Sequence, residues 1–156
     1  MYKIKENQLY VFLVHPGGPF WKNRDSGSWS IPKGEADNGE ISEKDLLEVA
    51  KREMKEETGI EVKSDTNFTY LDSVQQKSGK MVHAWAFEGN WHGLLMCSSF
   101  VEIEYPYKSG KKIKIPEVDK ADFFKIVKAK EKVNSAQIKL IERLENYLIK
   151  ESKQYG

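Results

Sequence analysis

The sequence predicts one α/β domain in which helices flank a central mixed β-sheet. The chain has 156 residues, of which 39% are hydrophobic, which suffices for one core and is too short for two comfortable ones. Apolar residues recur at strand spacing in several short segments and at helical spacing in two longer ones. No internal repeat or Pro/Gly/Ser-rich linker divides the chain. We therefore expect a single domain over residues 1–156.

Two extended segments are predicted in the N-terminal part. Gln8–His15 has the apolar, β-branched composition of a buried strand, and Pro16-Gly17-Gly18-Pro19 stops it. Gly27–Pro32 is the second extended segment, and a polar loop through Gly39 follows it. We expect the sheet to begin here.

A helix is predicted from Glu43 to Thr58. Ser42 is a suitable N-cap and Gly59 a suitable C-cap for this segment. Between them the apolar residues recur at helical spacing, at Leu46, Leu47, Val49, Ala50 and Met54.

The second half of the chain is expected to contain short strands and to end in a helix. The strands are predicted at Phe68–Gln75, Met81–Glu88, Phe100–Tyr105 and Ala121–Val127, the last of which leads into a helical turn. Lys77–Lys80 and Lys108–Lys112 have the composition of hairpin turns. Ser135–Lys150 carries an amphipathic apolar stripe and is expected to be a packing helix.

Charge and composition exclude several classes of function. The 25 basic residues nearly balance the 24 acidic ones, for a net charge of +1, so the chain is not a polycation that coats nucleic acid or an anionic membrane. No apolar run is long enough to span a bilayer, and no secretory signal is visible. Its single cysteine, Cys97, forms no intramolecular disulfide. A reducing cytoplasm is the expected location.

Three glutamates gather near the C-terminal end of the predicted helix. At 100° per residue, Glu56 lies about 60° to one side of Glu53 and Glu57 about 40° to the other. The helix C-terminus already carries partial negative charge, so this arrangement favours a bound divalent cation such as Mg²⁺ or Mn²⁺. The alternative is a solvated face on which neighbouring basic side chains, Lys51, Arg52 and Lys55, offset the glutamates.

The spacing of these residues resembles the Nudix box, G-x5-E-x7-R-E-U-x-E-E-x-G-U, where U is a bulky apolar residue. Arg52–Ile60 matches the second half at every defined position, and Gly34 and Glu40 have the x5 spacing. The resemblance continues outside the box and points to a bacterial, MutT-like subgroup of predicted NTP pyrophosphohydrolases, at Val14–Trp21, Trp29–Glu35, His83–Phe87 and Pro116–Asp119. It implies the Nudix α/β/α sandwich with a central mixed sheet.

The chain departs from the family pattern in one spacing. Eleven residues, 41–51, stand where the family usually has seven. Four extra helical residues make about one turn, so the helix face is kept, but Glu40 would be moved by about 6 Å along the axis. This affects the ion pair of Glu40 with Arg52 that the family arrangement implies, and Lys44, at the usual spacing, cannot substitute. The glutamates of the helix are untouched.

The resemblance also implies roles for individual residues. Metal coordination falls to Glu53, Glu56 and Glu57, with the carbonyl of Gly34, and the general base is Glu53 or a glutamate outside the helix. Arg52 is expected to hold the helix and loop in register. Candidates for an additional acid or base are the remaining glutamates of interest, Glu40, Glu102, Glu104 and Glu117.

Substrate contacts are expected from the segments before the box. Lys33 is a candidate for phosphate binding, with an exposed lysine as the alternative. Aromatic faces stack on nucleobases, so Phe20, Trp21 and Trp29 are candidates, with packing in the core or a loop as the alternative. His15 and His83 lie in strand patterns and are expected to be structural.

The predicted activity is the metal-dependent hydrolysis of a nucleoside diphosphate linked to another moiety. A nucleoside triphosphate and a dinucleoside polyphosphate are the competing substrates, and RNA caps are disfavoured because no extended basic surface is evident. The alternative is a catalytically silent Nudix module that senses nucleotides or binds protein. The expected partner is a small nucleotide, without a membrane, and the chain is a monomer or a homodimer.

Overall fold

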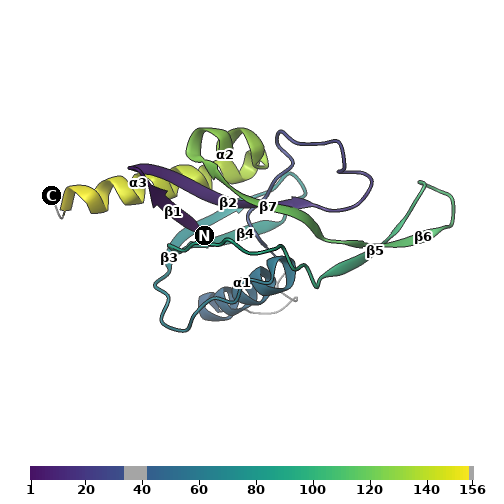
Figure 1. Ribbon diagram of the computed structural model, residues 1–156, viewed down its shortest axis with the longest axis horizontal. Helices are drawn as coiled ribbons and strands as arrows, with labels where there is room; N and C mark the ends of the chain where they lie inside the picture. Colours follow the sequence, from purple (N-terminus) through teal and green to yellow (C-terminus); the bar gives the residue numbers. More distant parts are fainter. Residues whose placement is uncertain (34–41, 155–156) are drawn as a thin grey trace.

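The computed structural model describes residues 1–33 and 42–154. Its central strand is β2 (Gln8–Pro16), which pairs antiparallel with β1 (Tyr2–Lys5) on one side and β7 (Val118–Lys125) on the other (Figure 1). β2 is long and apolar, and five consecutive residues of it, 11–15, are buried. It therefore separates the two halves of the core.

Two hairpins extend this arrangement. β3 (Thr69–Gln75) pairs with β4 (Met81–Ala86), and β5 (Phe100–Glu104) pairs with β6 (Lys112–Pro116). The β5–β6 hairpin projects from the body at one end of the long axis, opposite the C-terminal end of the chain (Figure 1). All described strand ladders are antiparallel, and parallel pairing is confined to isolated bridges such as Tyr2 with Glu88.

Helices lie on both sides of the strands. α1 (Glu43–Thr58) lies on one side, and α2 (Ile126–Lys132) and α3 (Ile138–Gln154) lie on the other (Figure 1). A short 3₁₀ turn, Ser135–Gln137, leads into α3. The α/β class predicted from the sequence is confirmed.

The alternation of side chains along β2 divides the core between the two helical layers. Val11 and Leu13 face a cluster that includes Leu140 and Leu144 of α3. Phe12 and Val14 face the opposite cluster, which includes Met54 of α1. The last turns of α1 are thereby packed against the central strand.

The ends of α1 are capped as predicted. The Ser42 side chain accepts a hydrogen bond from the Asp45 N–H, and Gly59 adopts the left-handed conformation at φ 80°. The space at position 59 is also restricted, because a Cβ there would lie 2.7 Å from the Met96 Cβ. The helix therefore ends at a defined point, directly after its glutamates.

The predicted elements differ from the structure mainly in the shortest and most polar segments. The helix over 43–58, the hairpin turns and the C-terminal helix are confirmed, whereas β1, β6 and most of α2 were not predicted. Gly27–Pro32 is bonded to its neighbours through isolated bridges at Trp29 and Ser30 and forms no regular strand. Among the described residues, no helix is long and apolar enough to cross a membrane.

Candidate active site at the end of helix α1

Two glutamates of α1 are buried where the helix meets the central strand. Glu53 is 9% exposed and Glu57 is 7% exposed, and Met54 between them belongs to the core cluster on that side of β2. Positions i and i+4 lie on one side of a helix, so packing of Met54 carries both carboxyl groups inward. Buried carboxylates at a helix C-terminus are unfavourable unless they are compensated.

A backbone N–H of the preceding loop partly compensates Glu57. Its Oε2 accepts a hydrogen bond from the backbone N–H of Lys33 at 3.1 Å. Burial nevertheless raises the pKa of Glu57 to about 8, opposed by the Lys33 N–H and the Lys33 charge and reinforced by the negative charges of Glu53 and Glu117. Glu57 therefore lies in an environment that repels its own charge, as acid–base and metal sites do.

Glu56 lies at the exposed edge of the same cluster. Its side chain is 43% exposed, and its Oε1 is 3.8 Å from Nε of Arg52. The Nη2 of Arg52 donates to Glu53 Oε1 at 3.1 Å. Arg52 thus links two of the three glutamates of the motif.

Glu117 approaches the helix glutamates from the strands. It stands between β6 and β7, and its carboxylate accepts a hydrogen bond from Ser99 Oγ. The backbone fixes the same pair, since the Glu117 N–H donates to the Ser99 carbonyl at 2.9 Å. The two other downstream candidates lie on the projecting hairpin, where Glu102 pairs with Lys112 and Glu104 accepts from the Gly110 N–H.

The start of β5 is also tied to α1. The Glu56 carbonyl accepts from the N–H groups of Ser98 at 2.7 Å and Ser99 at 3.2 Å. These bonds satisfy a carbonyl that the helix end leaves without an intrahelical partner. The connection before β5 is therefore held against the acidic end of the helix.

A cavity of about 230 Å³ opens beside Glu57 and Glu117. Lys33 and the aromatic side chain of Trp21 share its wall. Further polar residues of the wall come from segments that are distant in the sequence, at Ser28, Ser30, Gln76, Asn134 and Gln137. The lysine and the aromatic face suit an anionic ligand with a planar group, and the carboxylates beside them suit a cation.

The three aromatic candidates occupy different environments. Trp21 is 37% exposed and lines the cavity, with the Arg24 guanidinium 5.5 Å from its ring centroid. Trp29 also reaches the cavity wall but is 6% exposed, and its Nε1 donates to Asp25. Phe20 is 48% exposed and packs edge-on against Tyr105 of the hairpin; it is not among the residues that line the cavity.

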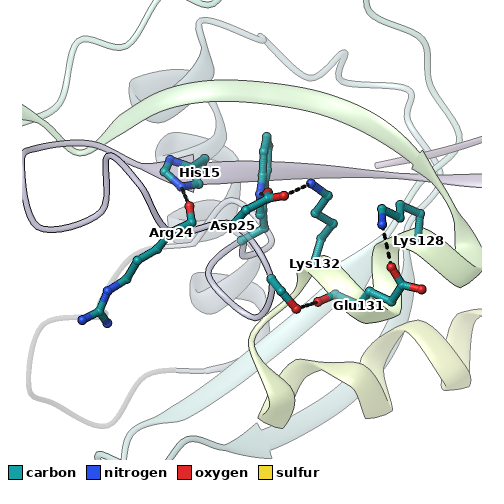
Figure 2. Close-up of polar contacts among 8 residues, drawn as sticks. His15, Arg24, Asp25, Lys128, Glu131 and Lys132 are labelled. Atoms are coloured by element: carbon teal, nitrogen blue, oxygen red, sulfur yellow. Dashed lines mark hydrogen bonds and ion pairs between the residues drawn. The ribbon is translucent and has the colours of Figure 1, made fainter.

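The loop that carries Trp21 is anchored at its far end (Figure 2). Buried His15 donates from Nε2 to the Arg24 carbonyl at 2.7 Å. Asp25 accepts from Lys132 at the end of α2, and the Gly27 N–H donates to the Glu131 carbonyl. The loop is thus fastened to β2 and α2.

The remaining predicted residues lie outside the described part of the chain. These are Gly34, whose carbonyl is an expected metal ligand, and Glu40, the first glutamate of the motif. Across residues 1–33 and 42–154, no three His, Cys, Asp or Glu side chains converge closely enough to hold a metal ion. The described glutamates supply the hard oxygen donors that Mg²⁺ prefers.

Two contributors to the site were not predicted from the sequence. Ser99 had no distinguishing pattern, because its pairing with Glu117 depends on the register of the hairpin between them. Gln137 is fully buried beside the cavity, and a polar residue at the start of an apolar helical stripe was the available signal.

The fold and site define an α/β/α sandwich protein with a buried acidic helix end facing a polar cavity. The NUDIX domain model matches residues 4–144, and the chain belongs to this family. Its members are mostly pyrophosphohydrolases and typically depend on a divalent metal.

Solved structures support the same fold. An Ap4A hydrolase of C. elegans, solved as a binary complex, is similar at 17% identity and a TM-score of 0.65, over 95% of this chain and 93% of that one. The NUDIX domain of Shewanella oneidensis NrtR, solved with ADP ribose, is similar at 15% identity and a TM-score of 0.60, over 94% of this chain and 82% of that one. No curated protein sequence gives a significant match.

Proposed function

We propose that this chain is a metal-dependent hydrolase of a nucleoside diphosphate linked to another moiety, and that it forms one Nudix domain. The observation that carries this proposal is the buried pair Glu53 and Glu57, of which Glu57 lines a cavity together with Glu117 and Lys33. A structural role alone does not explain buried carboxylates that repel one another. A cation and a phosphate ligand explain both the acidic and the basic side chains.

The donor set fits Mg²⁺, with Mn²⁺ as the alternative. Glu53 and Glu57 would hold the ion, with Glu56 and the carbonyl of Gly34 added by the family motif. The burial of Glu57 beside other acidic side chains favours a cation, because a carboxylate that burial and negative neighbours destabilise gains most from one. When bound, the ion supplies charge neutralisation of the diphosphate and a lower pKa of bound water.

Water attacks phosphorus in the proposed reaction. Its oxygen forms a bond to phosphorus as the bridging P–O bond breaks, and its proton passes to a carboxylate. Of the downstream candidates we assign this role to Glu117, since it lies beside Glu57 whereas Glu102 and Glu104 have partners on the hairpin. Glu53 is the alternative base. Arg52 holds the carboxylates of Glu53 and Glu56 in place.

The cavity accommodates the rest of the nucleotide. Lys33 is positioned for a phosphate, and Trp21 offers a ring face to a base. A nucleoside triphosphate and a dinucleoside polyphosphate both satisfy these contacts, and the fold likeness to the Ap4A hydrolase adds the second to the compounds to be tested. We place this activity in the cytoplasm, on small nucleotides.

A turnover screen tests the proposal. Nucleoside triphosphates, dinucleoside polyphosphates and nucleotide sugars would be incubated with Mg²⁺ or Mn²⁺, and the products resolved by chromatography. The wild-type chain is expected to cleave at least one class, and Glu53→Gln and Glu56→Gln to lose roughly 100-fold or more in kcat. Glu48→Gln is the matched control, because Glu48 lies on the same helix but pairs with Lys51 at the surface.

The silent binding module is the second candidate. The fold likeness to a NUDIX domain solved with ADP ribose is the observation in its favour. Nucleotide binding measured by calorimetry, together with the absence of turnover for every class and either metal, would replace the hydrolase by this module.

A further inference from the structure

Residues 29–31 form an extended segment held by hydrogen bonds on both sides. On one side, Ser30 exchanges two backbone bonds with Val14 of β2, at 2.8 and 2.9 Å. On the other side, the Trp29 N–H donates to the Lys132 carbonyl at 3.0 Å, and the Asn134 N–H donates to the Trp29 carbonyl at 2.7 Å. The segment therefore lies like a strand between β2 and the chain that leaves α2.

The Gln137 side chain continues the second row of bonds. Its Oε1 accepts from the Ile31 N–H at 3.0 Å, and its Nε2 donates to Ser30 Oγ at 3.0 Å. Ser30 Oγ in turn donates to the Ile31 carbonyl at 2.8 Å. Gln137 is 0% exposed, so its amide holds these groups in the absence of competing water.

The next backbone donor after Ile31 is the one that meets the acidic cluster. Pro32 has no N–H, and the Lys33 N–H donates to Glu57 Oε2. The direction of the Lys33 N–H thus depends on how Ile31 is held two residues earlier. The Gln137 side chain holds Ile31 by accepting from its N–H, on the side of the segment that faces away from β2.

We propose that Gln137 is a positioning residue for the hydrolysis: by fixing Ser30 and Ile31 it aims the Lys33 N–H at Glu57. This inference rests on the proposed function, because Glu57 matters to turnover only if the acidic cluster is the reaction site. Gln137 acts on the carboxylate through the backbone between residues 31 and 33.

Gln137→Met separates this role from packing. Methionine has a similar length and volume but has no amide to bond Ile31 and Ser30. We expect the half-saturating Mg²⁺ concentration to rise and kcat to fall, each by about tenfold, which corresponds to about 1.4 kcal/mol. KM for the nucleotide is expected to change by less than about threefold, since the cavity wall keeps its shape.

Leu140→Ala is the matched control. Leu140 is 2% exposed on the first turn of α3 and packs in the core cluster near Gln137. The substitution Leu140→Ala therefore loosens the packing of the same helix without removing a hydrogen bond to residue 30 or 31. If Gln137 only stabilised the fold, the two variants would lose kcat in proportion to their loss of unfolding free energy.

The experiment combines kinetics with amide hydrogen exchange followed by NMR. In Gln137→Met we expect the Lys33 amide to exchange about tenfold faster than in the wild type, and in Leu140→Ala to keep its protection. Unchanged exchange at Lys33 together with unchanged kcat in Gln137→Met would overturn the inference. Should Gln137→Met fail to fold, Ser30→Ala is the second variant, because it removes the acceptor of the Gln137 Nε2. In Ser30→Ala we expect kcat, the half-saturating Mg²⁺ concentration and the exchange rate of the Lys33 amide to change in the same directions, each by about threefold.

The two proposals fail in distinguishable ways. A wild-type chain without turnover would defeat the proposed function and the catalytic part of this inference, whereas the exchange of the Lys33 amide would still report whether Gln137 orients it. Turnover that is lost in Glu53→Gln but unaffected in Gln137→Met would leave the function standing and defeat the positioning role.

Discussion

His15 and Asp119 are joined by a hydrogen bond of 2.8 Å between Nδ1 and Oδ1, across the neighbouring strands β2 and β7. The same imidazole ring donates to the Arg24 carbonyl from its other nitrogen. A carbonyl oxygen only accepts, so Nε2 carries the hydrogen of this bond. One buried ring therefore connects two strands to the loop that carries Trp21.

Replacing this ring tests whether it holds the loop. His15→Phe keeps most of the volume but leaves the Arg24 carbonyl and Asp119 without their partner, so we expect the free energy of unfolding to fall by about 2–4 kcal/mol. Trypsin is expected to cut faster after Lys22 and Arg24. Asp119→Asn is the milder comparison, because asparagine retains an acceptor for the ring. Equal cleavage rates in His15→Phe and the wild type would refute the anchoring role.

Glu57 makes the stability of the metal-free chain depend on pH. Its folded-state pKa of about 8 lies above the ordinary value of 4.5, so between these values the folded chain keeps a proton that the unfolded chain has released. The free energy of unfolding therefore falls as pH rises through this window, and the loss is complete above about pH 8.

Glu57→Gln is expected to remove this loss of stability at high pH. Because glutamine stays neutral and can still accept from the Lys33 N–H, the variant is expected to match wild type near pH 4.5 and to be more stable by a few kcal/mol at about pH 8.5. Urea unfolding in the presence of a chelator at both pH values measures the difference. A variant less stable than wild type at the higher pH would show that Glu57 is well compensated as a carboxylate.

Ser99 is expected to influence turnover through Glu117. Ser99→Ala removes the hydroxyl that donates to the carboxylate, so Glu117 loses a fixed direction and kcat is expected to fall by about tenfold, with KM nearly constant. Ser109→Ala, at the tip of the hairpin, is the control.

Trp21 and Phe20 form a matched pair of neighbouring aromatic residues. Stacking on a base is worth about 1–3 kcal/mol, so Trp21→Leu is expected to raise KM for the nucleotide by about tenfold with little change in kcat. Phe20→Leu is expected to leave both constants near the wild-type values, since Phe20 packs on Tyr105 and is not among the cavity-lining residues. A higher KM in Phe20→Leu and an unchanged KM in Trp21→Leu would indicate that the base binds on the hairpin side of the loop.

Local elements were predictable because their signals lie in neighbouring residues. The period of α1, its Ser42 and Gly59 caps and the Lys77–Lys80 turn needed no distant contact to identify. β1 was not predicted because four residues with two lysines make a weak strand signal, and its pairing with β2 is a tertiary contact. The alternation of Tyr2 and Ile4 with lysines was the signal available.

The most specific sequence signal for the site was the motif on the helix. The motif pointed to Glu53, Glu56 and Glu57, but the structure distinguishes two buried carboxylates from an exposed one, because only packing decides which side of the helix faces inward. The choice among the downstream glutamates depends on strand register, because a shift of one residue turns every side chain of a strand to the other face of the sheet. The contribution of Gln137 to residues 30 and 31 spans more than a hundred positions and has no local signature.

The attachment of the β5–β6 hairpin has a mechanical consequence. Just before β5, the N–H groups of Ser98 and Ser99 donate to the Glu56 carbonyl. Just after β6, the Glu117 N–H donates to the Ser99 carbonyl, and the Glu117 carbonyl accepts from the Gly17 N–H. The hairpin is therefore fastened on both sides of its base. A force that tilts this projecting arm therefore acts directly on the end of α1 and on Glu117, the two places that carry the carboxylates of the candidate site.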